Sequence, residues 1–454
     1  MAVTSSPTDR RGRAPLHAGA LLAVVAALAA APAAVAARPH PARPAHPADE
    51  LVVGFRRGAG AGAQARLAAA SGARVLGLLP GRATRVGLKP GRSLAGTAAR
   101  LRRHRSVAYA VPDVAAHASA LEPNDPGFAL QWNFSGPYGI DMPDAWELAA
   151  RRDAPGGRGV TVAVLDTGVA YRTVGSQRRA PDFSAFVRGY DFVDDDPYPL
   201  DENGHGTHVA GTIGESTNNG VAATGVAYGA RIMPVRTLDA QGNGTAVTIA
   251  RGIWYAVRHH ADVINMSLEF GPRVDAKDVP ELLAAIRYAH RRGVVITTVA
   301  GNEGRSGELP FPARSSDVIA VGATTADGCA ARYSNAGPEV DVVAPGGGAD
   351  AAPHGDAWDA QHCRPNVAGP SIYQETLQRG RPGFGLPGGW YGTSMAAPHV
   401  AGLAALIIAS HRLGDRPSPE AVQQLVEQTA RDIGPPGFDP RYGHGLIDAA
   451  AALR

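Results

Sequence analysis

Val162-Ala-Val-Leu-Asp166-Thr-Gly168 joins four apolar residues to an aspartate and a glycine. A short apolar run that ends in turn residues is typical of a buried β-strand. Open α/β sheets place functional side chains at the carboxyl ends of their strands. We therefore expect Asp166 to lie at such an end. On its own, an aspartate in this position is more often a helix cap or a turn residue.

Other apolar runs follow along the chain and alternate with helical patterns. Strands that alternate with helices favour a parallel sheet covered by helices. We predict an α/β domain over residues 120–454, with a mostly parallel central sheet and helices on both faces. The predicted strands span 161–165, 231–235, 262–266, 293–299, 317–321 and 340–344, and the predicted helices span 245–259, 279–291, 394–410 and 418–430.

A smaller α+β domain is predicted before it, over residues 50–115. Residues 50–55 and 107–113 have strand patterns, and residues 64–70 and 94–103 suit helices. A stretch rich in Pro, His and Ala over 38–49 is typical of a linker.

The first 37 residues have the pattern of a secretory signal peptide. Arg10, Arg11 and Arg13 precede an apolar run over 18–31, and small residues over 34–37 offer a cleavage site. We expect a secreted, extracellular product with no membrane segment in its mature form. A retained anchor and a twin-arginine signal are alternatives, although Arg10-Arg11 is followed by Gly-Arg and not by an apolar residue.

Charge is distributed unevenly along the chain. Residues 1–115 contain 17 Lys and Arg but 4 Asp and Glu, whereas the remainder contains 27 and 37. A basic part and an acidic part of one chain attract each other, and the acidity of the larger part argues against nucleic acid as its partner. A basic leader with no such partner is the alternative.

Two cysteines occur, Cys329 and Cys363. An even pair in an exported chain predicts one disulfide, which closes a loop of about 35 residues and stabilises by about 3–4 kcal/mol on chain-entropy grounds. Two free buried thiols are the alternative. Neither cysteine lies near a histidine of the motifs below, which argues against a thiol protease.

Three further motifs contain residues suited to nucleophilic catalysis. They are Asn203-Gly-His205-Gly-Thr-His208, Ala300-Gly-Asn302-Glu-Gly304 and Gly392-Thr-Ser394-Met-Ala-Ala-Pro-His399. A serine hydroxyl needs an imidazole to take its proton and a carboxylate to orient that imidazole. The two histidines of the first motif lack a third ligand and the Glu of a His-Glu-x-x-His metal site. A second Asp-Thr-Gly, as an aspartic protease requires, and a lipase-type Gly-x-Ser-x-Gly are also missing.

Together these motifs resemble the subtilisin family of serine endopeptidases, the subtilases. The resemblance implies Asp166, His205 and Ser394 as the catalytic triad, His208 as a structural residue, and Asn302 as a donor to the oxyanion. It also implies polypeptide substrates and a monomeric enzyme. The small domain resembles the family's inhibitory propeptide, because its last strand, Val107-Ala-Tyr-Ala-Val-Pro-Asp113, has a similar pattern. The propeptide would be an intramolecular inhibitor of its own enzyme.

The resemblance also implies two edges that bind an extended substrate by main-chain hydrogen bonds. These edges are Gly242-Asn243-Gly244 and Ser267-Leu268-Glu269. The family usually has Gly at the position of Glu269, where it lines the pocket for the residue before the scissile bond. Glu269 could narrow that pocket, attract Lys or Arg, or turn to solvent or to Arg273.

Structural calcium is a further implication. Asp125, Asp182 and the Asn219 side chain would supply hard oxygen ligands. The carbonyls of Thr217, Val221 and Ala223 would complete the site. The acidic run over 194–196 is either another site or a solvated loop, and we favour the loop. A catalytically silent binding protein on the same fold is the competing hypothesis, and residues 346–388 have no predicted role beyond Cys363.

Overall fold

A computed structural model describes residues 50–79, 82–89, 92–113, 121–378 and 380–454. The predicted signal peptide and linker lie outside these ranges. Within them, every helix is too short or too polar to cross a lipid bilayer. The small N-terminal domain and the large C-terminal domain are described separately below.

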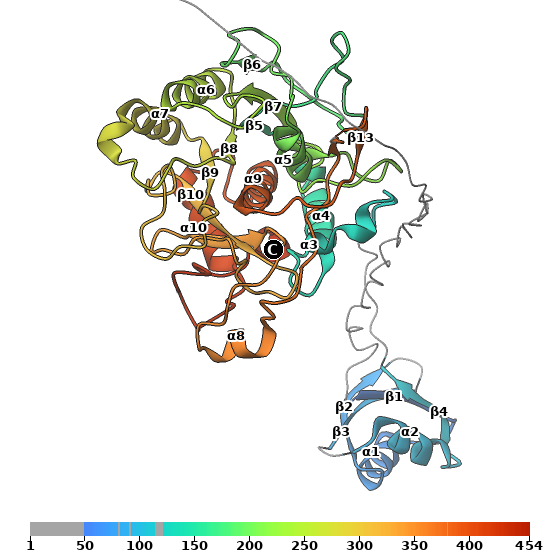
Figure 1. The fold of residues 1–454 in the computed structure, drawn as a ribbon. Helices are drawn as coiled ribbons and strands as arrows, with labels where there is room; N and C mark the ends of the chain where they lie inside the picture. The colour runs from blue at the N-terminus through green and yellow to red at the C-terminus, as the bar shows by residue number, and fades with distance from the viewer. Residues whose placement is uncertain (1–49, 80–81, 90–91, 114–120, 379) are drawn as a thin grey trace, which may run out of the picture. The chain divides into compact units, whose positions relative to one another are not determined.

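The large domain is built on a seven-stranded sheet in the order β11-β10-β9-β8-β5-β7-β6 (Figure 1). Every neighbouring pair in this sheet is parallel. The α/β prediction is therefore confirmed, and its six expected strands are all present. The strands are β5 (Thr161–Asp166), β6 (Tyr190–Asp191), β7 (Arg231–Arg236), β8 (Val263–Met266), β9 (Val295–Val299), β10 (Ile319–Thr324) and β11 (Val342–Pro345).

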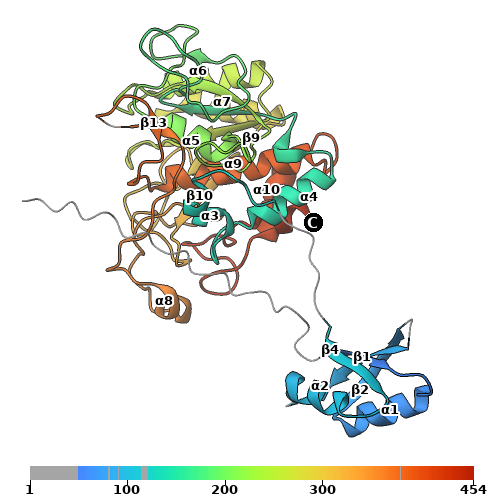
Figure 2. The ribbon, with the colours of Figure 1, turned by 90° about the vertical axis from the view of Figure 1, so that its right-hand side faces the viewer.

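Helices cover both faces of this sheet (Figures 1 and 2). In β5 alternate residues serve different cores, because successive side chains of a strand point to opposite faces. Val162 and Val164 belong to one apolar core, and Ala163 and Leu165 to the other. The helices are α3 (Trp132–Ser135), α4 (Met142–Arg151), α5 (His205–Gly214), α6 (Ala246–Arg258), α7 (Pro280–Arg291), α8 (Ala357–His362), α9 (Thr393–Ala409), α10 (Pro419–Thr429) and α11 (Ala449–Leu453).

The central helix α9 is apolar on nearly all sides, and a helix of this kind is buried on nearly all sides. It packs against β8, β9 and β10 and against α5. This packing brings the first residues of α5 and α9 to the carboxyl end of β5. His205 is the first residue of α5, Ser394 is the second of α9, and Asp166 is the last of β5.

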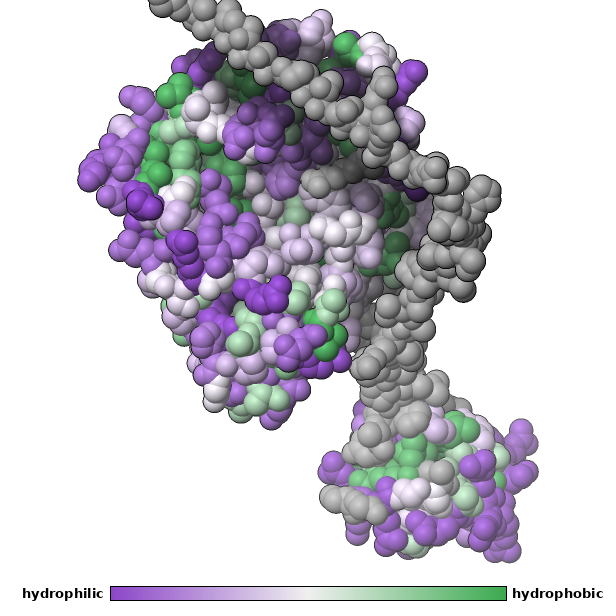
Figure 3. All heavy atoms as spheres, viewed as in Figure 1, coloured by the Kyte–Doolittle hydropathy of each residue, from purple (hydrophilic) through white to green (hydrophobic). Residues whose placement is uncertain are grey.

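The small domain has an antiparallel sheet in the order β2-β3-β1-β4 and two helices. Its elements match the predicted α+β pattern. Apolar side chains of β2 and β4 remain exposed, and Figure 3 shows a green patch on this domain. The elements are β1 (Glu50–Phe55), α1 (Ala61–Ala70), β2 (Ala73–Leu79), β3 (Ala83–Leu88), α2 (Leu94–Arg102) and β4 (Val107–Pro112).

The predicted disulfide joins Cys329 to Cys363, with a Cα–Cα distance of 5.6 Å. Cys363 follows α8, within the segment 346–388 that had no predicted role. This segment also contains a short hairpin of β12 (Thr376–Leu377) and β13 (Phe384–Gly385). The disulfide therefore ties this long excursion to the loop that follows β10.

Candidate active site

Asp166 and His205 form a hydrogen-bonded pair at the end of β5. The Asp166 side chain is fully buried, and its Oδ1 lies 2.7 Å from His205 Nδ1. The same oxygen accepts the Thr167 N–H at 2.7 Å. A side chain at Gly206 is excluded, since its Cβ would lie 2.1 Å from the Gly168 carbonyl oxygen. The glycine after His205 thus lets α5 approach β5 closely.

A second aspartate, Asp201, organises the loop before His205. It is buried, and its carboxylate accepts hydrogen bonds from the Thr167 hydroxyl at 2.9 Å and from the Thr207 hydroxyl at 2.6 Å. It also accepts the backbone N–H groups of Asn203, Gly204 and Thr207. Asp201 was not predicted, although its position within the Asp-x-x-Gly-His segment is a signal that could have drawn attention to it.

The electrostatics of His205 suit a general base. Burial lowers its pKa, but the Asp166 carboxylate, the hydrogen bond to it and the charge of Asp201 together raise the pKa above the ordinary histidine value. With Nδ1–H donated to Asp166, Nε2 is left to accept a proton. Asp166 thus fixes both the tautomer and the orientation of the imidazole.

His208 has a different environment. Its ring stacks on Trp390 with centroids 4.9 Å apart, and its Nε2 hydrogen-bonds the Ile372 carbonyl at 3.0 Å. Burial lowers its pKa to about 3, so it is neutral at physiological pH. Trp390 also lies near His205, with centroids 6.1 Å apart. These contacts suit a structural role for His208, and Trp390 was not predicted.

Ser394 and Asn302 lie side by side at the start of α9. Asn302 Oδ1 accepts the Thr393 N–H at 2.9 Å and the Thr393 hydroxyl at 3.0 Å. This fixes the amide, whose Nδ2 faces away from Thr393 and lies 3.5 Å from Glu269 Oε1. The Ser394 hydroxyl lies 3.5 Å from the Ser267 carbonyl oxygen, and within the described part of the chain it has no hydrogen bond to His205.

One cleft brings these groups together with both predicted substrate edges. It has a volume of about 490 Å³ and is lined by His205 and Ser394. All six predicted edge residues line it as well: Gly242, Asn243, Gly244, Ser267, Leu268 and Glu269. Residues as far apart in the sequence as His205 and Ser394 therefore meet at one concave surface, as a peptide-binding site requires.

Comparison with known proteins agrees with this geometry. The subtilase family profile matches residues 157–445, and the fervidolysin N-terminal prodomain profile matches residues 32–113. The chain belongs to the subtilase family. It is a serine-type endopeptidase that carries an N-terminal prodomain.

Individual subtilases show the extent of the similarity. Thermitase of Thermoactinomyces vulgaris is 35% identical over 337 residues, which are 73% of this chain and 99% of thermitase. Subtilisin E of Bacillus subtilis is 35% identical over 359 residues, 78% of this chain and 77% of that protein. A solved protease structure from Pseudoalteromonas arctica has a TM-score of 0.58 and 32% identity, and covers 73% of this chain and 98% of its own.

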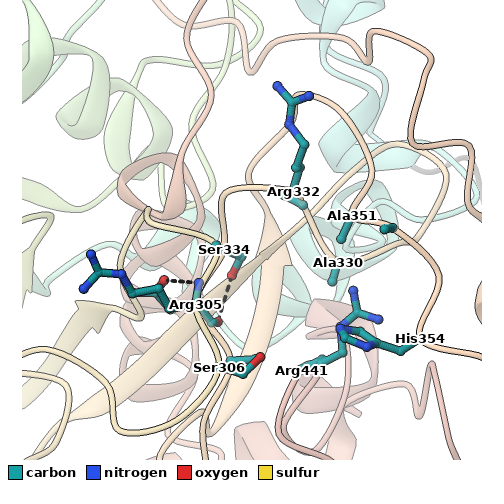
Figure 4. A pocket seen from close by; sticks show the side chains of 13 residues that line it. Arg305, Ser306, Ala330, Arg332, Ser334, Ala351, His354 and Arg441 are labelled. Atoms are coloured by element: carbon teal, nitrogen blue, oxygen red, sulfur yellow. Dashed lines mark hydrogen bonds between the residues drawn. The ribbon is translucent and has the colours of Figure 1, made fainter.

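The subtilase has a second cavity, of about 240 Å³, which none of the proposed catalytic residues lines. Arg305, Arg332, His354 and Arg441 contribute to its walls. Figure 4 shows the Arg305 and Arg332 side chains pointing in different directions, and Arg441 is paired with the buried Asp359. The cationic groups do not converge, so the cavity is not organised as an anion site.

The side chains predicted to bind calcium lie together. Asn219 links the other two, because its Nδ2 donates to Asp182 Oδ1 at 2.7 Å and its N–H donates to Asp125 Oδ1 at 3.0 Å. The loop over 217–223 closes around them, and the Ala223 N–H bonds Asp182 Oδ2 at 3.2 Å. The carboxylate oxygens of Asp125 and Asp182 are hard ligands of the kind calcium prefers, whereas the Asn219 amide oxygen accepts the Val221 N–H at 2.9 Å. Within the described ranges, no three His, Cys, Asp or Glu side chains are arranged as metal ligands.

Two buried glutamates adjoin Asp182, and neither was predicted. Glu375 Oε2 accepts the Asp182 N–H at 3.0 Å, and Glu215 Oε1 accepts the Glu375 N–H at 2.7 Å. Glu215 Oε2 is buried without a hydrogen-bond partner. We call Asp182, Glu215 and Glu375 the buried acid cluster. Burial first, and the charge of Glu375 among other groups, raises the pKa of Asp182 to about 7.

The carboxylates of the acidic run over 194–196 contact other groups of the protein. Asp194 pairs with Arg236, and Asp195 pairs with Arg251 at 2.7 Å. Asp196 accepts the Tyr198 N–H at 2.7 Å. Whether this run is a solvated loop or a further cation site stays a prediction.

Proposed function

We propose that the subtilase cleaves peptide bonds through an acyl-enzyme formed on Ser394. The 2.7 Å contact between Asp166 Oδ1 and His205 Nδ1, in the cleft that holds Ser394, carries this proposal. When substrate binds, the Ser394 hydroxyl turns from the Ser267 carbonyl toward His205 Nε2. Hydrogen bonds between nucleophile and base are commonly long before substrate binds.

The reaction then follows from the positions of the groups. Ser394 Oγ attacks the carbonyl carbon while His205 Nε2 takes its proton. The tetrahedral intermediate collapses as His205 returns that proton to the leaving amine, and the acyl group stays on Ser394. Water repeats the sequence and releases the acid. Asp166 stabilises the imidazolium in both halves.

Asn302 stabilises the charge that develops on the substrate oxygen. Its Nδ2 is held beside Ser394 by the two hydrogen bonds from Thr393 to Oδ1. The Ser394 N–H, in the first turn of α9, is the second donor, because such N–H groups have no partner within a helix. Fixed donors of this kind contribute roughly 10²–10³ in kcat each.

Casein hydrolysis tests the proposal. Wild type should digest casein and be inactivated by a covalent serine-directed inhibitor, with the label on Ser394. Ser394→Ala should be inactive and unlabelled. Ser184→Ala is the matched control, since Ser184 is exposed and does not line the cleft. Full activity of Ser394→Ala would contradict the proposed nucleophile.

We further propose that the enzyme is secreted as a zymogen and processes itself. The basic prodomain and the acidic catalytic domain attract each other, and the last strand of the prodomain occupies the cleft until the chain is cut between residues 114 and 124. Ser394→Ala should accumulate as the proform and be cut when active enzyme is added. Normal self-processing by Ser394→Ala would argue against this route.

Structural calcium is the remaining part of the proposal. Asp125, Asp182 and Asn219 would hold the ion, with carbonyls of Thr217, Val221 and Ala223. A cation there would neutralise part of the charge of the buried acid cluster and stabilise the folded enzyme by mass action.

A further inference from the structure

The site that receives the residue before the scissile bond can be located from the proposed mechanism, on which this inference rests. The leaving amine must face His205, which protonates it, and the substrate oxygen must face Asn302. The acyl side of the substrate therefore runs along the Ser267–Glu269 edge. Its last side chain enters the part of the cleft that Leu268, Glu269 and Val299 line.

Glu269 lines this part of the cleft. Its Oε1 lies 3.5 Å from Asn302 Nδ2, and its Oε2 is buried without a hydrogen-bond partner. A Cβ added to Gly301 would lie 2.4 Å from Oε2, so the carboxylate rests directly on the Gly301 backbone. Of the three sequence-based alternatives, the turn to solvent or to Arg273 is thus not the one adopted.

The surroundings of Glu269 are acidic or neutral. Glu303, the residue after Asn302, is the charged neighbour of Glu269. In the described ranges, no ion pair joins Glu269 to a cation. Asn335 Nδ2 donates to Glu303 Oε2 at 2.7 Å and holds that carboxylate in place. Burial first, and the charge of Glu303 second, raises the pKa of Glu269 to about 7. The site thus has excess negative charge and an unsatisfied acceptor.

We propose that Glu269, supported by Glu303, selects Lys or Arg as the residue before the scissile bond. A cationic side chain would supply the donor that Glu269 Oε2 lacks and would offset the charge of Glu303. A large apolar side chain would instead leave this oxygen buried and unpaired, which is unfavourable. The carboxylate also fills space that glycine leaves open, so the same residue disfavours Phe and Leu.

A peptide series that varies only this residue tests the proposal at pH 8. The informative pair is Arg and citrulline, which have nearly the same shape but differ in charge. We expect kcat/KM for Arg to exceed that for citrulline by roughly tenfold or more. In Glu269→Gln the ratio should fall to near one, and covalent labelling of Ser394 by a serine-directed inhibitor shows that the variant is folded. Glu303→Gln should give an intermediate ratio.

Glu281→Gln is the matched control, because Glu281 is an exposed glutamate on α7. The ratio of kcat/KM for Arg to that for citrulline should be the same in this variant as in wild type. The wild-type ratio should also decline below pH 7 as Glu269 becomes protonated. Equal cleavage after Arg and citrulline, or a preference for Phe or Ala, would overturn the assignment of Glu269. Failure of every peptide together with absent labelling of Ser394 would instead overturn the proposed mechanism.

Discussion

The catalytic pair and the buried acid cluster both place carboxylates away from solvent, but they differ in how the charge is balanced. Asp166 has His205 at 2.7 Å and a backbone N–H at the same distance. Asp182, Glu215 and Glu375 lie near one another, and burial is the first cause that raises the pKa of each. In the first region a histidine balances the carboxylate, whereas in the second three carboxylates lie near one another.

The largest effect should come from breaking the first region. Asp166→Asn keeps the shape of the side chain but no longer holds His205 in the correct tautomer. We expect kcat to fall by about 10⁴, as for loss of the orienting carboxylate in such triads. Peptide hydrolysis measures this, with Asp415→Asn as a control because that side chain is 95% exposed. A loss of less than tenfold would mean that His205 is oriented by other groups.

The stability of the second region should depend on calcium and not on the catalytic activity of the triad. Chelation should lower the melting temperature of the mature enzyme, inactivated beforehand by a covalent inhibitor to prevent autolysis. At a calcium concentration 100 times the dissociation constant, the lost stabilisation is about 2.7 kcal/mol. Asp182→Ala should melt like the chelated enzyme and no longer respond to added calcium. Identical melting of the wild type with and without chelator would contradict a calcium site.

The two regions also differ in how far the sequence predicts them. Asp166, His205 and Ser394 each lie in a local motif at the end of a predicted strand or the start of a predicted helix. Because the sheet is parallel, the carboxyl ends of its strands and the first residues of the following helices lie at the same edge. The local motifs are therefore enough to predict that these side chains meet. The central sheet, its helices and the single disulfide could be predicted for the same reason, since each follows from local periodicity or residue count.

The acid cluster could not be predicted in this way. Glu215 and Glu375 are 160 positions apart, and Glu375 lies in a segment with no periodic pattern. Their burial follows from tertiary packing of that segment, which no local rule supplies. Glu269 is an intermediate case. The sequence identified its position, but the direction of its side chain depends on Gly301 and Asn302, which are more than 30 residues away.

A smaller effect should distinguish the cluster from an ordinary buried polar site. Glu375→Gln keeps an oxygen to accept the Asp182 N–H but removes one charge. Burial raises the pKa of Glu375 to about 7 in the folded state, so its stabilising contribution is present below about pH 4 and is lost as pH rises through 7. We therefore expect Glu375→Gln to stabilise the calcium-free enzyme at pH 8 by about 1 kcal/mol, with a smaller gain at pH 5.

Melting of the calcium-free, covalently inhibited enzyme at these two pH values measures the effect of Glu375→Gln. Glu281→Gln is again the exposed control. With calcium bound the benefit should shrink, because the ion already offsets the charge. If Glu375→Gln instead destabilises the calcium-free enzyme at pH 8, Glu375 is ionised there and is stabilised by a partner. The buried acid cluster would then not be a region of unbalanced charge.

The smallest effect concerns the pH at which the catalytic pair becomes active. Only neutral His205 can accept the Ser394 proton, so kcat/KM must rise with pH through the pKa of His205. Although burial opposes it, the Asp166 carboxylate and its hydrogen bond, with Asp201, raise this pKa above 6.5. A citrulline substrate is required, because a basic one would add the titration of Glu269 to the profile. We expect the rising limb to have its midpoint above 6.5 and to be unchanged in Glu269→Gln. A midpoint well below 6.5 would mean that burial affects the pKa of His205 more than Asp166 does. The claim that the charge of Asp166 is balanced by His205 would then be wrong.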